Sequence, residues 1–148
     1  NGYKRLRHPV EHKRRLAHSY SAEGETIFQV ADYLDSRAPH TYELIWNFGP
    51  RVTLEPSLGL DTATTQVAEW WIYIEGEKKL GFVISSGTAP LDICAYHGDG
   101  SIPAGFYSRK FGERLPVTQI RVKLQRPGGE IVTQMKRLLK PKASPCVE

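Results

Sequence analysis

Strict alternation of apolar and polar residues along two segments constrains this fold more than any other feature of the sequence. In residues 40–48 and 118–125, every second side chain is apolar. The apolar positions are Tyr42, Leu44, Trp46 and Phe48 in the first segment and Ile120, Val122 and Leu124 in the second. A period of two is typical of a β-strand that packs on a core with one face and meets water with the other. Such strands belong to antiparallel sheets.

Eight further strands are predicted from β-branched and aromatic content. They cover residues 12–20, 26–35, 51–55, 65–75, 80–86, 91–96, 105–110 and 130–138. Glycine-containing turns separate several of them, and residues 131–139 are as compatible with a short helix as with a strand. About nine or ten short strands without an internal repeat predict an all-β fold, an antiparallel β-sandwich. We expect one domain over residues 1–148, with loose ends at about residues 1–8 and 140–148.

Length and composition exclude several classes of protein. The chain has 148 residues, about one domain, with 40% hydrophobic and 24% charged residues. It has no apolar run long enough for a membrane span, and no secretory signal is expected from the basic N-terminal residues, which leaves the compartment open. It also lacks a phosphate-binding loop, a dinucleotide fingerprint and a nucleophile elbow. We therefore expect no cofactor.

The cysteines and histidines do not predict a metal site or a disulfide. Cys94 lies in a predicted strand, where a small buried side chain is expected, and Cys146 lies near the C-terminus. His8 and His12 are four residues apart, but Pro9 between them disfavours the helix that would bring them to one face. We expect no metal.

Basic residues gather at both ends of the chain. Residues 1–20 contain six Lys or Arg against one Glu, and residues 136–148 contain four against one. Such ends suit nucleic acid, an anionic surface or an acidic polysaccharide, or are simply solvated. The aromatic residues follow the spacing of a strand core and form no base-stacking motif, which disfavours nucleic acid.

One residue pair follows from the predicted pairing of the first two strands as a hairpin. The register that pairs Tyr20 with Thr26 places Arg14 opposite Asp32. Asp32 shares its face with apolar residues, and a carboxylate there is costly unless it is paired. A bidentate contact with Arg14 would meet this need. We predict a structural pair here in preference to a catalytic carboxylate.

Five short segments occur in an informative order. They are G-Y-x-R-L-x4-E-H-x-R-R at residues 2–15, V-A-D-Y-L at 30–34, H-x5-W-x-F-x-P at 40–50, G-F-Y-S-R-K-F-G-E-R-L-P at 105–116, and Thr133. Together they resemble the C-terminal β-sandwich of the heparinase II/III-like polysaccharide lyases, over almost the whole chain. No single segment is specific, and the order of all five carries the resemblance.

The resemblance implies a function. Members of the family join an N-terminal α/α toroid to antiparallel β-sheet domains, and they cleave uronate-containing polysaccharides by β-elimination with general acid–base groups. Their H-x-H-x-D and H-N segments, which bring histidines and a frequent zinc site, do not occur in this chain. No catalytic residue is therefore transferred. The expected function is that of the C-terminal part of a larger lyase, inactive alone, whose partners are an acidic polysaccharide and the toroid.

The candidate site residues form two groups, of which only the first is transferred from the family. The matching framework positions are Arg14, Asp32, His40, Trp46, Ser108 and Gly112. The residues expected to contact substrate are His12, Arg14 and Arg109. For His12 and His40 a structural hydrogen-bonding role is the favoured alternative. Trp70 and Trp71 should point to opposite faces, one in the core and one available for packing or for stacking on a sugar. A non-catalytic carbohydrate-binding sandwich for acidic glycans also stays open.

Overall fold

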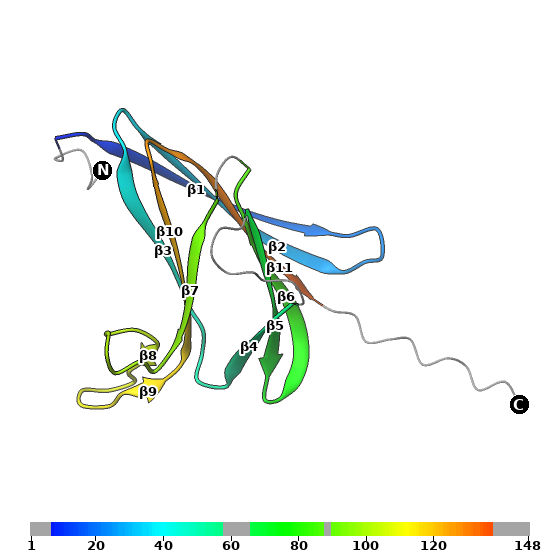
Figure 1. Ribbon diagram of the computed structural model, residues 1–148. Helices are drawn as coiled ribbons and strands as arrows, with labels where there is room; N and C mark the ends of the chain where they lie inside the picture. The colour runs from blue at the N-terminus through cyan, green and yellow to red at the C-terminus, as the bar shows by residue number, and fades with distance from the viewer. Residues whose placement is uncertain (1–6, 58–65, 88–89, 138–148) are drawn as a thin grey trace, which may run out of the picture.

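The computed structural model describes residues 7–57, 66–87 and 90–137, and these residues form eleven strands without a helix (Figure 1). The strands are β1 (Val10–Tyr20), β2 (Thr26–Ser36), β3 (His40–Asn47), β4 (Val52–Pro56), β5 (Val67–Ile74), β6 (Glu77–Ser85), β7 (Asp92–His97), β8 (Phe106–Tyr107), β9 (Leu115–Pro116), β10 (Thr118–Arg126) and β11 (Gly129–Arg137). All their pairings are antiparallel. The predicted all-β antiparallel sandwich is confirmed. Residues 129–137 are a strand, so the helical alternative there is wrong.

The strands form two sheets of unequal width. Six strands pair in the order β1-β2-β11-β6-β5-β4, three pair in the order β3-β10-β7, and β8 and β9 form a separate small hairpin. The chain crosses between the sheets after β2, β3, β6 and β10. The described residues contain no helix with the length and hydropathy of a membrane span.

The core lies between the two sheets, around the ring of Phe82 on β6. Phe82 is fully buried, and the rings of Trp46, Phe48 and Trp70 lie with their centroids 5.2–5.8 Å from it. The predicted alternation is confirmed here, because Trp70 points into the core while Trp71 lies on the opposite face under the Lys78 ammonium group. Burial of these aromatic side chains supplies much of the hydrophobic stabilisation.

A glycine turn sets the geometry of the crossing from β10 to β11. Gly129 has a φ of 147°, and a Cβ at Gly128 would overlap the carbonyl group of Leu34. The backbone of the turn can therefore lie directly against β2. This close approach brings the Pro127 carbonyl within 3.0 Å of the Tyr42 hydroxyl, which donates a hydrogen bond to it.

The narrow sheet leaves part of the wide sheet uncovered. Leu16, Tyr20 and Phe28 lie on the core-facing side of β1 and β2, as their register with buried Val30 requires. They are nevertheless 63%, 69% and 38% exposed. Figure 1 shows the β1–β2 hairpin extending past the other strands on this side.

Two local expectations were wrong. The strand predicted at residues 105–110 is only Phe106–Tyr107, and a loop with exposed Phe111 follows it. Cys94 is half-buried rather than a core residue, and its thiol lies 3.9 Å from an oxygen of Asp92. Cys146 and the expected C-terminal loose end lie outside the described residues.

Candidate functional site

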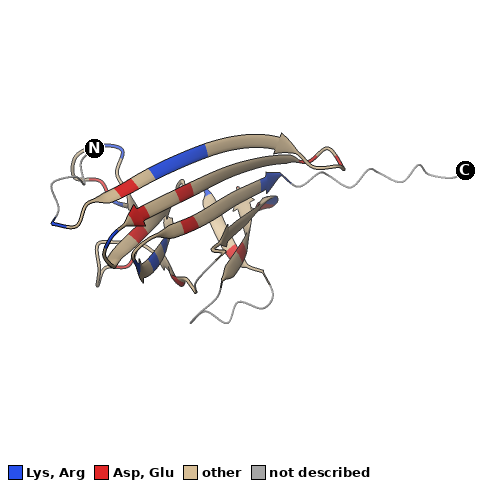
Figure 2. Ribbon diagram, turned by 90° about the horizontal axis from the view of Figure 1, so that it is seen from above, with Lys and Arg blue, Asp and Glu red and all other residues tan. Residues whose placement is uncertain are grey.

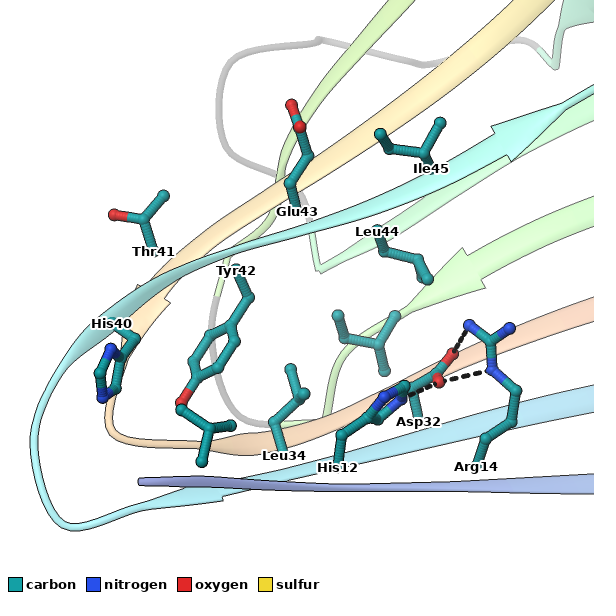
Figure 3. Close-up of a pocket in the computed structure, with 12 residues that line it drawn as sticks. His12, Arg14, Asp32, Leu34, His40, Thr41, Tyr42, Glu43, Leu44 and Ile45 are labelled. Carbon is teal, nitrogen blue, oxygen red and sulfur yellow. Dashed lines mark hydrogen bonds and ion pairs between the residues drawn. The ribbon is translucent and has the colours of Figure 1, made fainter. Parts of the chain in front are cut away.

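A pocket of about 450 Å³ opens between β3 and the near edge of the six-stranded sheet (Figure 3). The strands β1, β2 and β11 supply its floor, and β3 supplies the opposite wall. Its lining residues are Val10, His12, Arg14, Asp32, Leu34, His40, Thr41, Tyr42, Glu43, Leu44, Ile45 and Ile131. Both polar groups and aliphatic side chains line the pocket, as in small-molecule sites.

Asp32 is the most buried charged residue of this pocket. Its side chain is 2% exposed, and Arg14 lies directly opposite it across the β1–β2 hairpin. The Arg14 guanidinium donates from Nε to Oδ1 at 2.7 Å and from Nη2 to Oδ2 at 3.1 Å. The predicted register and the predicted charge-assisted contact are both confirmed. A buried carboxylate needs such partners because its desolvation is otherwise uncompensated.

His12 is a second partner of the same carboxylate. Its Nε2 lies 2.6 Å from Asp32 Oδ1, and its side chain is 34% exposed. His12 and Arg14 are two residues apart on β1, so both point to the face that carries Asp32 on β2. Figure 3 shows the two side chains on either side of the carboxylate. Both oxygens of Asp32 are therefore engaged.

His40 and Tyr42 lie above this cluster on the β3 side. Their rings are 6.0 Å apart. Burial, followed by the nearby negative charge of Asp35, raises the pKa of Tyr42. The protonated hydroxyl donates a hydrogen bond to the Pro127 carbonyl oxygen. The Nε2 atom of His40 is buried without a hydrogen-bond partner among the described residues. The structural hydrogen-bonding role favoured for His40 is therefore not met at that atom, and its framework role stays a prediction.

One cationic side chain stays partly exposed at the opening of the pocket. The Arg14 side chain is 44% exposed even while it binds Asp32. Glu43, the other carboxylate in the lining, points away from the cluster in Figure 3. Its Oε1 atom lies 3.8 Å from Nη1 of Arg121 and 4.0 Å from Nζ of Lys123. The exposed edge of the guanidinium is thus available to an anion.

The remaining sequence-predicted residues lie elsewhere. Ser108, Arg109 and Gly112 belong to the loop between β8 and β9, beside the start of β10, whereas His40 pairs with Arg126 at its end. The length of β10 separates the two places by roughly 25 Å. Trp46 lies in the core against Phe82. The structure therefore brings together His12, Arg14, Asp32 and His40, and the role of Arg109 in substrate binding stays a prediction.

The wall of the pocket does not follow from the sequence pattern. Alternation predicts that Tyr42 and Leu44 face the core from one strand, but it does not say which strand of the other sheet they face. No group of three or more potential metal ligands occurs among the described residues.

Comparison with known proteins assigns the chain to a family. A family model described as "Heparinase II/III-like, C-terminal" matches residues 1–138. The chain belongs to the heparinase II/III-like C-terminal family. The predicted resemblance is thereby confirmed over nearly the whole chain. Searches of curated proteins and of solved structures returned no match.

Proposed function

We propose that this chain is the C-terminal β-sandwich of a heparinase II/III-like polysaccharide lyase and that it holds an acidic, uronate-containing polysaccharide for that enzyme. The observation that carries the proposal is the half-exposed guanidinium of Arg14 at the mouth of a pocket in a member of this family. A guanidinium suits a carboxylate or sulfate group because it offers several donors in one plane.

The pocket is better suited to binding than to acid–base chemistry. Asp32 already accepts hydrogen bonds at both oxygens. The Tyr42 hydroxyl, whose pKa is raised by burial, donates a hydrogen bond to a backbone carbonyl. The Nε2 atom of His12 is bound to Asp32, and the unpartnered Nε2 atom of His40 is buried away from solvent. General acid–base catalysis requires a group that is free to exchange a proton with substrate. The proton-transferring groups of the proposed lyase are accordingly assigned to the rest of the enzyme, including the expected N-terminal toroid.

The test is binding of size-defined oligosaccharides from heparin and alginate to the purified chain, followed by amide chemical shifts. We expect the largest shifts at residues 10–14 and 40–45, and weaker binding as salt rises. Arg14→Gln should lower the affinity by about tenfold, the equivalent of about 1.4 kcal/mol. Arg15→Gln is the matched control, because Arg15 carries the same charge on the opposite face of the same strand.

Two results would contradict the proposal. One is equal loss of binding in the Arg14 and Arg15 variants, which would indicate non-specific attraction. The other is a set of amide chemical-shift changes that lie away from the pocket. This measurement uses the unmodified protein, so it decides the question even if Arg14→Gln does not fold. A neutral dextran and a DNA oligomer serve as competitors, and neither should displace the acidic sugar.

We also expect the chain alone to release no unsaturated uronate product. Turnover that a point substitution within the chain abolishes would show that the catalytic groups are here.

A further inference from the structure

The face of β1 that carries the pocket continues beyond it. Alternate residues of a strand share a face, so the side that presents His12 and Arg14 next presents Leu16, His18 and Tyr20. Leu16 and Tyr20 are more than three-fifths exposed. In a closed sandwich this face would be covered by the second sheet, but here the second sheet has only three strands.

The exposed part of this face offers several aromatic rings. The rings of His18 and Tyr20 meet edge to face with centroids 5.0 Å apart, and Phe28 on β2 lies directly opposite His18. Such amphipathic rings can pack against the apolar face of a sugar while their polar atoms stay hydrated.

Charge permits an acidic occupant on this side of the hairpin. Within β1 and β2, both described in full, Asp32 is the one carboxylate on the inner face, and Arg14 and His12 already bind it. The outer face of the same two strands carries Glu11 and Asp35 beside Lys13 and Arg15. The inner face has no carboxylate from Leu16 to Tyr20 or from Thr26 to Val30, so an anionic chain that extends from Arg14 in this direction meets none on these two strands.

We propose that the acidic glycan is bound as an extended chain along the inner face of β1, from Arg14 to the rings of His18 and Tyr20. The inference rests on the proposed function and adds to it the length and direction of the ligand. Arg14 and Tyr20 are six residues apart, which corresponds to roughly 20 Å along a strand. That span takes several sugar units. A single unit would fill the pocket and leave Tyr20 unused.

The experiment is calorimetric titration with di-, tetra- and hexasaccharides of heparin and of alginate. For the acidic series that binds, affinity should rise at least tenfold from the disaccharide to the hexasaccharide. Tyr20→Ala should remove most of that gain and leave disaccharide binding unchanged. Tyr33→Ala is the matched control, because Tyr33 is 40% exposed on the outer face of the same hairpin. It should leave the length dependence unchanged.

The outcomes separate the two proposals. If no oligosaccharide binds the unmodified chain, the proposed function fails, and this inference fails with it. If the disaccharide binds as tightly as the hexasaccharide, or if Tyr20→Ala and Tyr33→Ala behave alike, only the extended path is overturned. A third outcome is that the chain self-associates, that Tyr20→Ala abolishes this association, and that sugar binding does not depend on length. The face would then bind a second copy of the chain, and the extended path would again be overturned. Tyr20 is 69% exposed, so its loss should leave the melting temperature close to that of the unmodified protein.

Discussion

Removal of the guanidinium at Arg14 should destabilise the fold, because the carboxylate of Asp32 has no access to water of its own. Arg14→Met keeps the aliphatic stem and removes both hydrogen bonds, at 2.7 and 3.1 Å. Loss of one partner from a buried ion pair costs about 3–5 kcal/mol. Arg14 is 44% exposed and His12 remains bound, so water and the imidazole compensate in part. We expect about 3 kcal/mol, the low end of that range.

Urea unfolding followed by tryptophan fluorescence measures this cost. For a chain of this size, about 3 kcal/mol corresponds to a melting temperature lower by roughly 6–12 °C. Asp32→Leu in the Arg14→Met background should recover most of the loss, because a pair of apolar residues needs no partner. Arg15→Met, on the outer face, should change stability by less than about 0.5 kcal/mol.

The reasoning would be refuted by a specific pattern. If the free energy of unfolding of Arg14→Met lies within about 0.5 kcal/mol of that of the unmodified protein, the burial of Asp32 does not depend on the Arg14 guanidinium. If the double variant is no more stable than Arg14→Met, the two side chains are not coupled.

Three further predictions concern other parts of the fold. Gly105→Ala should lower the free energy of unfolding by about 3 kcal/mol, because φ is +71° and a Cβ would lie 2.6 Å from the Gly98 nitrogen and 2.9 Å from the Val117 carbonyl oxygen. Gly112→Ala, at φ +79° in open space, should lower it by only about 1 kcal/mol in the same unfolding assay. Phe82→Ala should cost about 3–5 kcal/mol, and a loss below about 1 kcal/mol would contradict the assigned core. Hydrogen bonds from the hydroxyl and the backbone N–H of Ser101 lower the pKa of Asp99, so the stability that Asp99 contributes is present above its pKa in the unfolded chain and is lost as pH falls through its pKa in the folded protein. Ser101→Ala should raise the Asp99 pKa in an NMR titration, and an unchanged value would refute this cause.

The strands and the first hairpin could be predicted because their signals are local. A period of two is visible within a single strand, as β3 and β10 show. The register of β1 with β2 follows from the short turn between them, where Gly24 adopts a φ of 80°. Once that register is known, the need of a buried carboxylate for a partner places Arg14 beside Asp32.

The pocket could not be predicted because it depends on how two sheets are stacked. Tyr42 faces Leu34 and His12 across a gap that no sequence spacing encodes. Arg109 shared a motif with the family, but its distance from Arg14 is set by the path of β10 and the small hairpin before it. The unequal width of the sheets was also not foreseeable, because β3 and β11 carry similar apolar patterns and join different sheets.

The position of β1 at one edge of the wide sheet has a consequence for solubility. Among the described residues it pairs with β2 alone, so one side of an eleven-residue strand presents backbone groups to any other chain. Figure 2 shows the run of basic residues along this strand, from Lys13 to Arg15. An antiparallel copy aligned on that run would set like charges against each other. The repulsion should keep the edges apart in dilute buffer and weaken at high salt, where the screening length falls from about 10 Å at 0.1 M to about 3 Å at 1 M. Concentrated salt is thus expected to drive this protein toward edge-to-edge aggregation.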